Sequence, residues 1–154
     1  ARRYAIDNAH RIKGLGPNSW GMSACISPTT GYSGQYGSHP IGHGHPLLED
    51  GTVAPYGALS FLPFTPKESI DALEYMYRIP GLVGKYGLYD AYSYQTKAKG
   101  DQPWIAESYL GIDKGLVLLM FENYSTQLIW KLLHQNNHIR KGFEVLLFER
   151  KPDR

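Results

Sequence analysis

The sequence predicts an all-α domain whose helices are joined by long, aromatic-rich loops. Thr65-Pro66-Lys67-Glu68 has the pattern of a capping box, with proline at the first helical position of a segment that reaches residue 79. Residues 112–134 form a long segment that is apolar on nearly every side around 116–121. No segment alternates polar and apolar residues over six positions, so strand signals are weak. The length of 154 residues indicates a single domain.

The first half of the chain is expected to hold two short helices around a long loop. Residues 2–12 have helical spacing, with four apolar residues on one face: Ala5, Ile6, Ala9 and Ile12. Residues 18–50 show neither helical nor strand periodicity, and a loop of this length in a compact domain is usually functional or disordered. Its aromatic residues argue against disorder. A short helix follows at 53–61, with Pro55 tolerated in its first turn.

The second half should supply most of the helical core. In helix 66–79 we expect a buried stripe of three residues: Ile70, Leu73 and Tyr77. Residues 81–111 return to loop character. The apolar segment 112–134 is expected to be one central, buried helix, and a last helix starts near Asn137. Its apolar residues at helical spacing are Ile139, Phe143, Leu146 and Leu147.

Composition excludes several classes of protein. Sixteen basic and 14 acidic side chains leave a net charge of +2, which gives no nucleic-acid signal. The longest apolar run, Leu116 to Phe121, is too short to cross a bilayer. The single cysteine, Cys25, allows no intrachain disulfide. Twelve tyrosines and three tryptophans suit a wet sugar-binding cleft, although tyrosines also fill half-buried positions.

Asp90 is the first candidate site residue because it lies in the stretch GLYDAYSY, among Tyr89, Tyr92 and Tyr94. Burial among rings raises the pKa of a carboxyl group, whereas hydrogen bonds to the ionised form lower it. Either effect serves acid–base chemistry. The alternative is an aspartate that caps backbone amides in a loop.

Asp113 and Glu122 flank the most apolar part of the chain. Nine residues at about 100° each place them on opposite helix faces, so they cannot form one catalytic pair on one face. Asp113 suits a helix start, where its charge favours the helix dipole. Glu122 lies mid-helix and needs a partner, either in a cleft or in a tie to a loop amide or an arginine.

Three histidines lie close together in SHPIGHGHP, at His39, His43 and His45. Imidazole is a common zinc ligand, but this spacing lacks a helical or hairpin frame and no cysteine is nearby. A polar loop is therefore favoured over a metal site.

Several segments together resemble one family. They are NSWGMSA at 18–24, GYSGQYG at 31–37, DGTVAPYGALSFLPFTPKES at 50–69, KYGLYDAYS at 85–93 and YLGIDKGLVLLMFENYSTQLIWKLL at 109–133. This order of blocks resembles the C-terminal region of the bacterial glucoamylase-like family, which includes endo-β-1,2-glucanases. A related domain occurs in cyclic β-1,2-glucan synthases. The resemblance covers about residues 2–148.

The resemblance implies part of an (α/α)₆ toroid, in which helical hairpins surround a sugar-binding cleft. Six hairpins need about twelve helices, which alone would nearly use up this chain, since helices average about 11–12 residues. Only about five helices are expected here. We therefore expect residues 1–154 to be the C-terminal part of one such domain, with its N-terminal part missing, or else a much reduced relative. The family resemblance favours a periplasmic or secreted bacterial protein.

The resemblance also assigns site residues. It implies that Asp90 is a catalytic cleft carboxylate, with Glu122 a second choice. It implies that Asp50 binds sugar hydroxyls or caps the helix that follows, and that five rings stack on the substrate: Trp20, Tyr36, Tyr56, Tyr89 and Trp104. Asp113 is a further candidate for substrate binding. Two segments depart from the family pattern. Lys114-Gly115-Leu116 stands where the family usually has Gln-Gly-Pro, and 24–27 lack the acid that commonly follows the tryptophan–glycine block.

The function implied is cleavage of a β-linked glucan, with β-1,2-glucan favoured, by carboxylate acid–base chemistry without a metal or organic cofactor. At least one catalytic carboxylate should lie upstream, so the isolated chain should be inactive. Two alternatives stay open: a non-catalytic carbohydrate-binding domain, and a transglycosylating domain of a cyclic glucan synthase.

Overall fold

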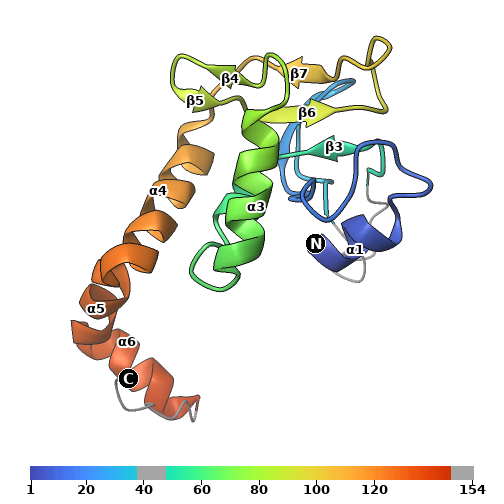
Figure 1. The fold of residues 1–154 in the computed structure, drawn as a ribbon. Coiled ribbons are helices and arrows are strands. Elements are labelled where there is room, and N and C mark those ends of the chain that lie inside the picture. The colour runs from blue at the N-terminus through green and yellow to red at the C-terminus, as the bar shows by residue number, and fades with distance from the viewer. Residues whose placement is uncertain (38–47, 147–154) are drawn as a thin grey trace.

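The computed structural model describes residues 1–37 and 48–146, and these residues combine helices with short strands (Figure 1). The helices are α1 (Arg2–Asp7), α2 (Pro55–Leu59), α3 (Pro66–Tyr77), α4 (Gly111–Thr126), α5 (Leu128–Gln135) and α6 (Asn137–Val145). The strands are β1 (Cys25–Ser27), β2 (Gly31–Ser33), β3 (Thr52–Val53), β4 (Val83–Gly84), β5 (Gly87–Leu88), β6 (Ala91–Ser93) and β7 (Trp104–Ala106). The expected all-α class is not confirmed. The strands are two or three residues long, too short for alternation to show in the sequence.

The strands form three small antiparallel sheets within the two loop regions. β1 pairs with β2, and β4 pairs with β5 in a hairpin. The third sheet has the order β3-β6-β7, with Tyr92 opposite both Val53 and Ile105. This sheet joins the segment before α2 to the segment that precedes α4, so it fixes where both helices begin.

The main core lies between α2, α3 and the N-terminal segment, and Trp20, Met76 and Tyr92 are among its buried side chains. A close backbone approach closes it at Gly21, whose carbonyl accepts a hydrogen bond from the N–H of Ala54 at 3.1 Å. A Cβ atom on Gly21 would come within 2.6 Å of the Ala54 carbonyl oxygen, and its φ of +121° suits glycine alone.

Helix α3 has the predicted place but not the predicted buried stripe. Its buried residues are Ser69, Ala72 and Met76, whereas Ile70 and Tyr77 are exposed and Leu73 is half-buried. Small residues face the core because α3 packs closely on α2, where the Ser69 hydroxyl donates to the Ala58 carbonyl at 3.0 Å. Proline at the first position is confirmed, but the Thr65 side chain makes no capping hydrogen bond.

The expectation of one buried helix over 112–134 is wrong. Gln127 takes a left-handed conformation, with φ of 59°, and divides the segment into α4 and α5. Asp113 and Asn123 are the buried residues of α4, and α5 has none. Helix α6 begins at the predicted Asn137 after the Asn136 cap, and it too buries none of its residues. Leu147 lies outside the described residues.

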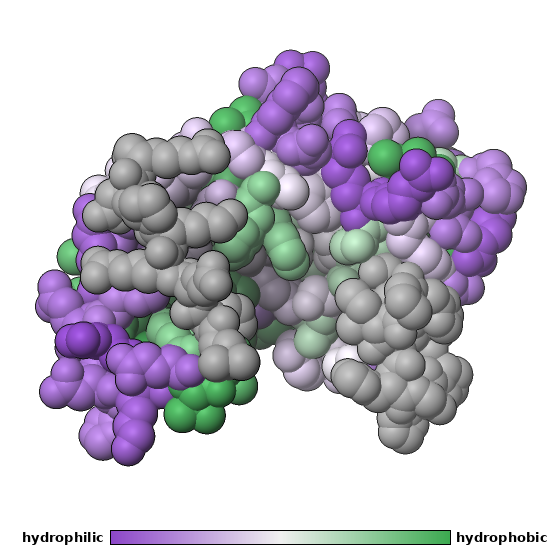
Figure 2. All heavy atoms as spheres, turned by 90° about the horizontal axis from the view of Figure 1, so that it is seen from below, coloured by the Kyte–Doolittle hydropathy of each residue, from purple (hydrophilic) through white to green (hydrophobic). Residues whose placement is uncertain are grey.

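Helices α4 to α6, residues 111–145, form an arm that leaves the rest of the described chain, here called the body (Figure 1). Phe64 of the body contacts Trp130 of the arm, with ring centroids 5.7 Å apart. Seen from below, hydrophobic side chains gather at the centre of the molecule, between more polar flanks (Figure 2). No helix in residues 1–37 or 48–146 is long and apolar enough to cross a membrane.

The two short helices of the first half are only partly as predicted. Helix α1 ends at Asp7, five residues before the expected end. Ala5 and Ile12 are buried as expected, but Ile6 and Ala9 are exposed. Helix α2 confirms the predicted short helix, with Pro55 as its first residue.

Candidate functional site

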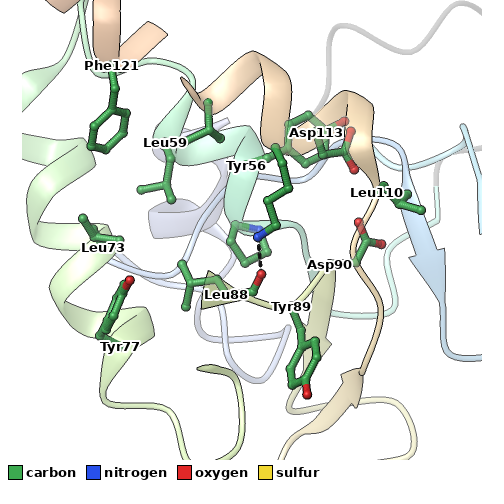
Figure 3. A pocket seen from close by; sticks show the side chains of 13 residues that line it. Tyr56, Leu59, Leu73, Tyr77, Leu88, Tyr89, Asp90, Leu110, Asp113 and Phe121 are labelled. Carbon is green, nitrogen blue, oxygen red and sulfur yellow. Dashed lines mark hydrogen bonds between the residues drawn. The ribbon is translucent and has the colours of Figure 1, made fainter. Parts of the chain in front are cut away.

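A pocket of about 200 Å³ opens between α2, α3 and α4, over the segment 88–90 (Figure 3). Leu73 and Tyr77 of α3 and Val117 and Phe121 of α4 form its apolar walls. At its other end lie Tyr56, Leu110 and three charged residues: Asp90, Asp113 and Lys114. The pocket therefore has an apolar part and a polar end with two carboxyl groups.

The sheet brings Asp90 and Asp113 together although they are far apart in the sequence. Asp90 directly precedes β6, and its N–H donates to the Ser108 carbonyl at 3.0 Å, just beyond β7. The chain then enters α4, whose third residue is Asp113. The pairing of β6 with β7 thus places the first turn of α4 over Asp90.

The Asp90 carboxylate is 4% exposed and held from one side. Its Oδ2 accepts a hydrogen bond of 2.7 Å from the N–H of Ile26 in β1. Its Oδ1 is buried and has no hydrogen-bond partner. Asp90 is therefore desolvated, as its tyrosine neighbours suggested, and it also accepts from a backbone amide, as the alternative of a capping aspartate predicts.

The Asp113 side chain lies in the first turn of α4, as predicted, and is 6% exposed. Its Oδ2 is also buried without a partner. Burial raises the pKa of Asp113 to about 6, reinforced by the hydrogen bond that its protonated form would donate to Asp90 and by the Asp90 charge, while Lys114 opposes the shift. In Figure 3 the carboxyl groups of Asp90 and Asp113 point toward each other.

Lys114 is a site residue that the sequence marked only as a departure from the family pattern. Its Nζ donates to the Leu88 carbonyl, and it lies 5.4 Å from the centre of the Tyr109 ring. Burial lowers the pKa of Lys114, and the charges of Asp90 and Asp113 oppose that shift. The described residues show no ion pair between Lys114 and either aspartate.

Two of the predicted rings line the pocket. The Tyr56 hydroxyl donates to the Ala24 carbonyl at 3.0 Å and hydrogen-bonds with Ser23 Oγ at 2.7 Å, which fixes the ring. Tyr89 packs on Tyr109 with ring centroids 5.0 Å apart. Gly84 makes room for this pair, because a Cβ there would lie under 3.0 Å from both rings.

The other predicted rings lie away from the pocket. Trp20 is 3% exposed and belongs to the main core. Trp104 is half-buried in β7 and packs against a second cluster that contains Tyr36. Burial raises the pKa of Tyr36 to about 12, and its hydroxyl donates to Asp50 Oδ2 at 2.8 Å.

Neither Asp50 nor Glu122 is among the residues that line the pocket. Asp50 Oδ1 accepts from the N–H of Thr52 at 3.0 Å, so this carboxylate holds the turn before β3. Glu122 accepts a hydrogen bond from Thr126 Oγ1 on its own helix. It is half-buried, on the opposite face of α4 from Asp113.

Cys25 is buried beside the polar end of the pocket, and burial raises the pKa of its thiol, assisted by the charges of Asp90, Asp50 and Asp113. Within residues 1–37 and 48–146, no group of three or more His, Cys, Asp or Glu side chains is arranged to hold a metal ion. His39, His43 and His45 lie outside the described residues.

Comparison with known proteins assigns the family. The family model described as "Putative glucoamylase" matches residues 1–137. The chain belongs to this family. The resemblance noted in the sequence is thereby confirmed over most of the chain.

Similar proteins include β-1,2-glucan hydrolases by name. The chain is 32% identical over 148 residues to an exo β-1,2-glucooligosaccharide sophorohydrolase of Parabacteroides distasonis, covering 94% of this chain and 18% of that protein. A structure of an endo-β-1,2-glucanase from Chitinophaga pinensis, in complex with sophorotriose and glucose, aligns with a TM-score of 0.74 and 34% identity. It covers 93% of this chain and 31% of that one. A Bacteroides uniformis structure described as a putative glucoamylase aligns with a TM-score of 0.74 and 36% identity over the same shares.

The chain spans less than a third of the length of these relatives.

Three features of the site were not predicted from the sequence: Lys114, the Tyr109 ring, and the wall formed by Leu73 and Tyr77. The sequence did carry a signal for the wall, since its two residues belong to the apolar stripe that was expected in the core. An amphipathic stripe shows that a face is covered or recessed, but not whether core or pocket lies beyond it.

Proposed function

We propose that this chain is the C-terminal portion of a glycoside hydrolase domain that cleaves a β-linked glucan, with β-1,2-glucan as substrate. The observation that carries the proposal is the pair of buried carboxyl groups, Asp90 and Asp113, at the polar end of a pocket edged by tyrosine rings. The names of the relatives supply the linkage.

Glycoside hydrolysis requires one protonated carboxyl group at the leaving oxygen and one carboxylate that activates water or attacks the sugar carbon. Asp90 suits the second role or a substrate anchor, because the Ile26 N–H stabilises its ionised form. Glu122 is not retained in this role, since its carboxylate bonds within α4, outside the pocket. The acid that protonates the leaving group is then expected upstream.

The proposed architecture is one part of an (α/α)₆ toroid that is completed by a preceding segment of the same domain. The pocket volume of about 200 Å³ is below the ~300–1,000 Å³ typical of small-molecule sites, as expected where one wall is missing. Leu118 and Leu128 of the arm are exposed, and a neighbouring element would bury them.

A chimera tests the function. This chain would replace the corresponding third of the Chitinophaga pinensis endo-β-1,2-glucanase, and β-1,2-glucan hydrolysis would be measured with the isolated chain alongside. We expect the chimera to hydrolyse the glucan and the isolated chain to release no product.

Asp90→Asn in the chimera should then lower kcat by at least about 100-fold, as for loss of a general acid or base. Asp101→Asn, on an exposed loop, is the control and should leave kcat unchanged. Sugar binding by a folded chimera that releases no product would instead indicate a carbohydrate-binding domain, and full activity of the isolated chain would refute the proposed missing wall.

A further inference from the structure

We propose that Asp90 and Asp113 hold one proton between them, and that Asp113 is a positioning residue which keeps Asp90 as the ionised partner. At pH values below the Asp113 midpoint, the pair would thus enter a reaction in the pocket with a single negative charge. The catalytic meaning of this pair rests on the proposed function, but the pair itself is a property of the chain.

The geometry leaves one unpaired oxygen on each side chain. Asp90 Oδ1 and Asp113 Oδ2 are both buried and both lack a hydrogen-bond partner. The two carboxyl groups point toward each other at the polar end of the pocket (Figure 3). Two carboxylate oxygens cannot bond to each other, because both only accept. One proton on Asp113 turns it into a donor and satisfies both oxygens.

The charges around the pair favour the same state. Two like charges this deeply buried would be expensive without a counter-ion. Lys114 is the cation nearest in sequence, but its Nζ donates to the Leu88 carbonyl and forms no ion pair with either aspartate in the described residues. The one positive charge of Lys114 balances an aspartate pair with one negative charge better than a pair with two.

The hydrogen bonds decide which aspartate keeps the proton. Asp90 Oδ2 already accepts from the Ile26 N–H, a bond that stabilises the ionised form. A protonated Asp113 is further supported by the pKa of about 6 that burial and Asp90 give it. The other titratable groups that face the pair are Lys114 on α4, Cys25 on β1 and Tyr56 on α2, and the thiol and the phenol stay neutral because their pKa values are raised.

The test is an NMR titration of the 154-residue chain with ¹³C-labelled aspartate carboxyl groups. We expect Asp113 to titrate near pH 6, with the Asp90 signal shifting at that same midpoint. The signal of the exposed Asp101 serves as the internal control. Titration of Asp113 near pH 4, without a response from Asp90, would overturn the proposal.

Two variants separate proton sharing from simple burial. Asp90→Asn removes the neighbouring charge and should lower the Asp113 midpoint by on the order of one pH unit or more. Asp113→Asn should remove the response of the Asp90 signal near pH 6. A midpoint of Asp113 that is unchanged in Asp90→Asn would show that burial alone sets it, which contradicts sharing.

The fold of each variant is checked by its backbone amide spectrum, and the two substitutions are independent, so one usable variant is enough. Hydrolysis is not a readout of these titrations. An inactive chimera together with a coupled titration would contradict the proposed function alone. An active chimera together with uncoupled aspartates would contradict the shared proton alone.

Discussion

Asp90 and Asp113 are held at the same end of the pocket by different means. A backbone N–H fixes Asp90, whereas Asp113 is placed by the first turn of α4. The sequence identified both residues, the first by its tyrosine neighbours and the second by its place at a helix start. It did not pair them, because the contact depends on β6 and β7, strands of three residues that carry no periodic signal.

The raised pKa of Asp113 predicts a pH-dependent stability. The unfolded chain releases this proton near pH 4 and the folded chain near pH 6, so the folded state binds more protons in this window. The stability that Asp113 contributes is therefore full below about pH 4 and lost as the pH rises to about 6. A folded pKa that lies one pH unit above the unfolded value contributes about 1.4 kcal/mol.

Urea unfolding of the wild type and of Asp113→Asn between pH 4 and 8 measures this effect. The free energy of unfolding of the wild type, relative to the variant, should fall by a few kcal/mol up to pH 6 and then stay constant. The Asp101→Asn control should give no such slope. A constant difference between wild type and Asp113→Asn across the range would contradict the raised pKa.

Gly84→Ala tests the packing at the mouth of the pocket. The added Cβ would lie under 3.0 Å from Tyr109 and Tyr89, so the rings must move or the β4–β5 hairpin must shift. We expect a loss of about 1–3 kcal/mol in the free energy of unfolding.

Gly115→Ala is the matched comparison, since a Cβ there meets nothing within 4 Å and lies inside α4. It should stabilise the chain by about 0.5–1 kcal/mol. Equal effects of the two substitutions in thermal unfolding would show that Gly84 has no packing role.

At the scale of the elements, the break between α4 and α5 is the main departure from expectation. The segment contains no glycine or proline near 127, so no helix-stop signal was visible. The buried Asn123 accounts for the break through its side chain: its Oδ1 accepts from the Trp130 N–H at 3.1 Å, a group that would donate to the Thr126 carbonyl in a continuous helix. One residue thus ends α4 and anchors α5.

Asn123→Ala should loosen α5 while leaving the body folded. The Trp130 N–H loses its acceptor, at a cost of about 1 kcal/mol or more. Hydrogen exchange of the amides in 128–135 should accelerate, and that of α3 should not. Ser125→Ala, which removes only an exposed bond to the Phe121 carbonyl, is the control. Unchanged exchange in α5 would mean that Asn123 does not anchor it.

At the scale of the whole molecule, the arrangement of the body was harder to predict from the sequence than the positions of its helices. Helices α2 and α3 were located because proline and a following apolar pattern mark them. The sheets were missed because strands of two or three residues are too short to show a periodic pattern, whether their partner is close in the sequence or distant. The buried character expected of 112–134 was wrong because the hydrophobicity of a segment does not show whether other residues cover it, and no residue of α5 is buried in the described structure.

The arm should make the isolated chain self-associate. Leu118 is 71% exposed and Leu132 is 53% exposed, and monomers rarely leave such surfaces uncovered. We expect the average mass in sedimentation to rise with concentration. The double change Leu118→Glu and Leu132→Glu should restore the monomer, whereas Lys131→Glu, on an exposed position, should not. A wild-type chain that stays monomeric at high concentration would contradict this.

Cys25 is a natural probe of local opening at the inaccessible end of the pocket. As the chain's single thiol, buried and kept in its unreactive neutral form, it should ignore an alkylating reagent while β1 stays seated over Asp90. Its labelling rate would then measure how often that strand opens. A bound sugar that protects the region would lower this rate, and no engineered label is needed.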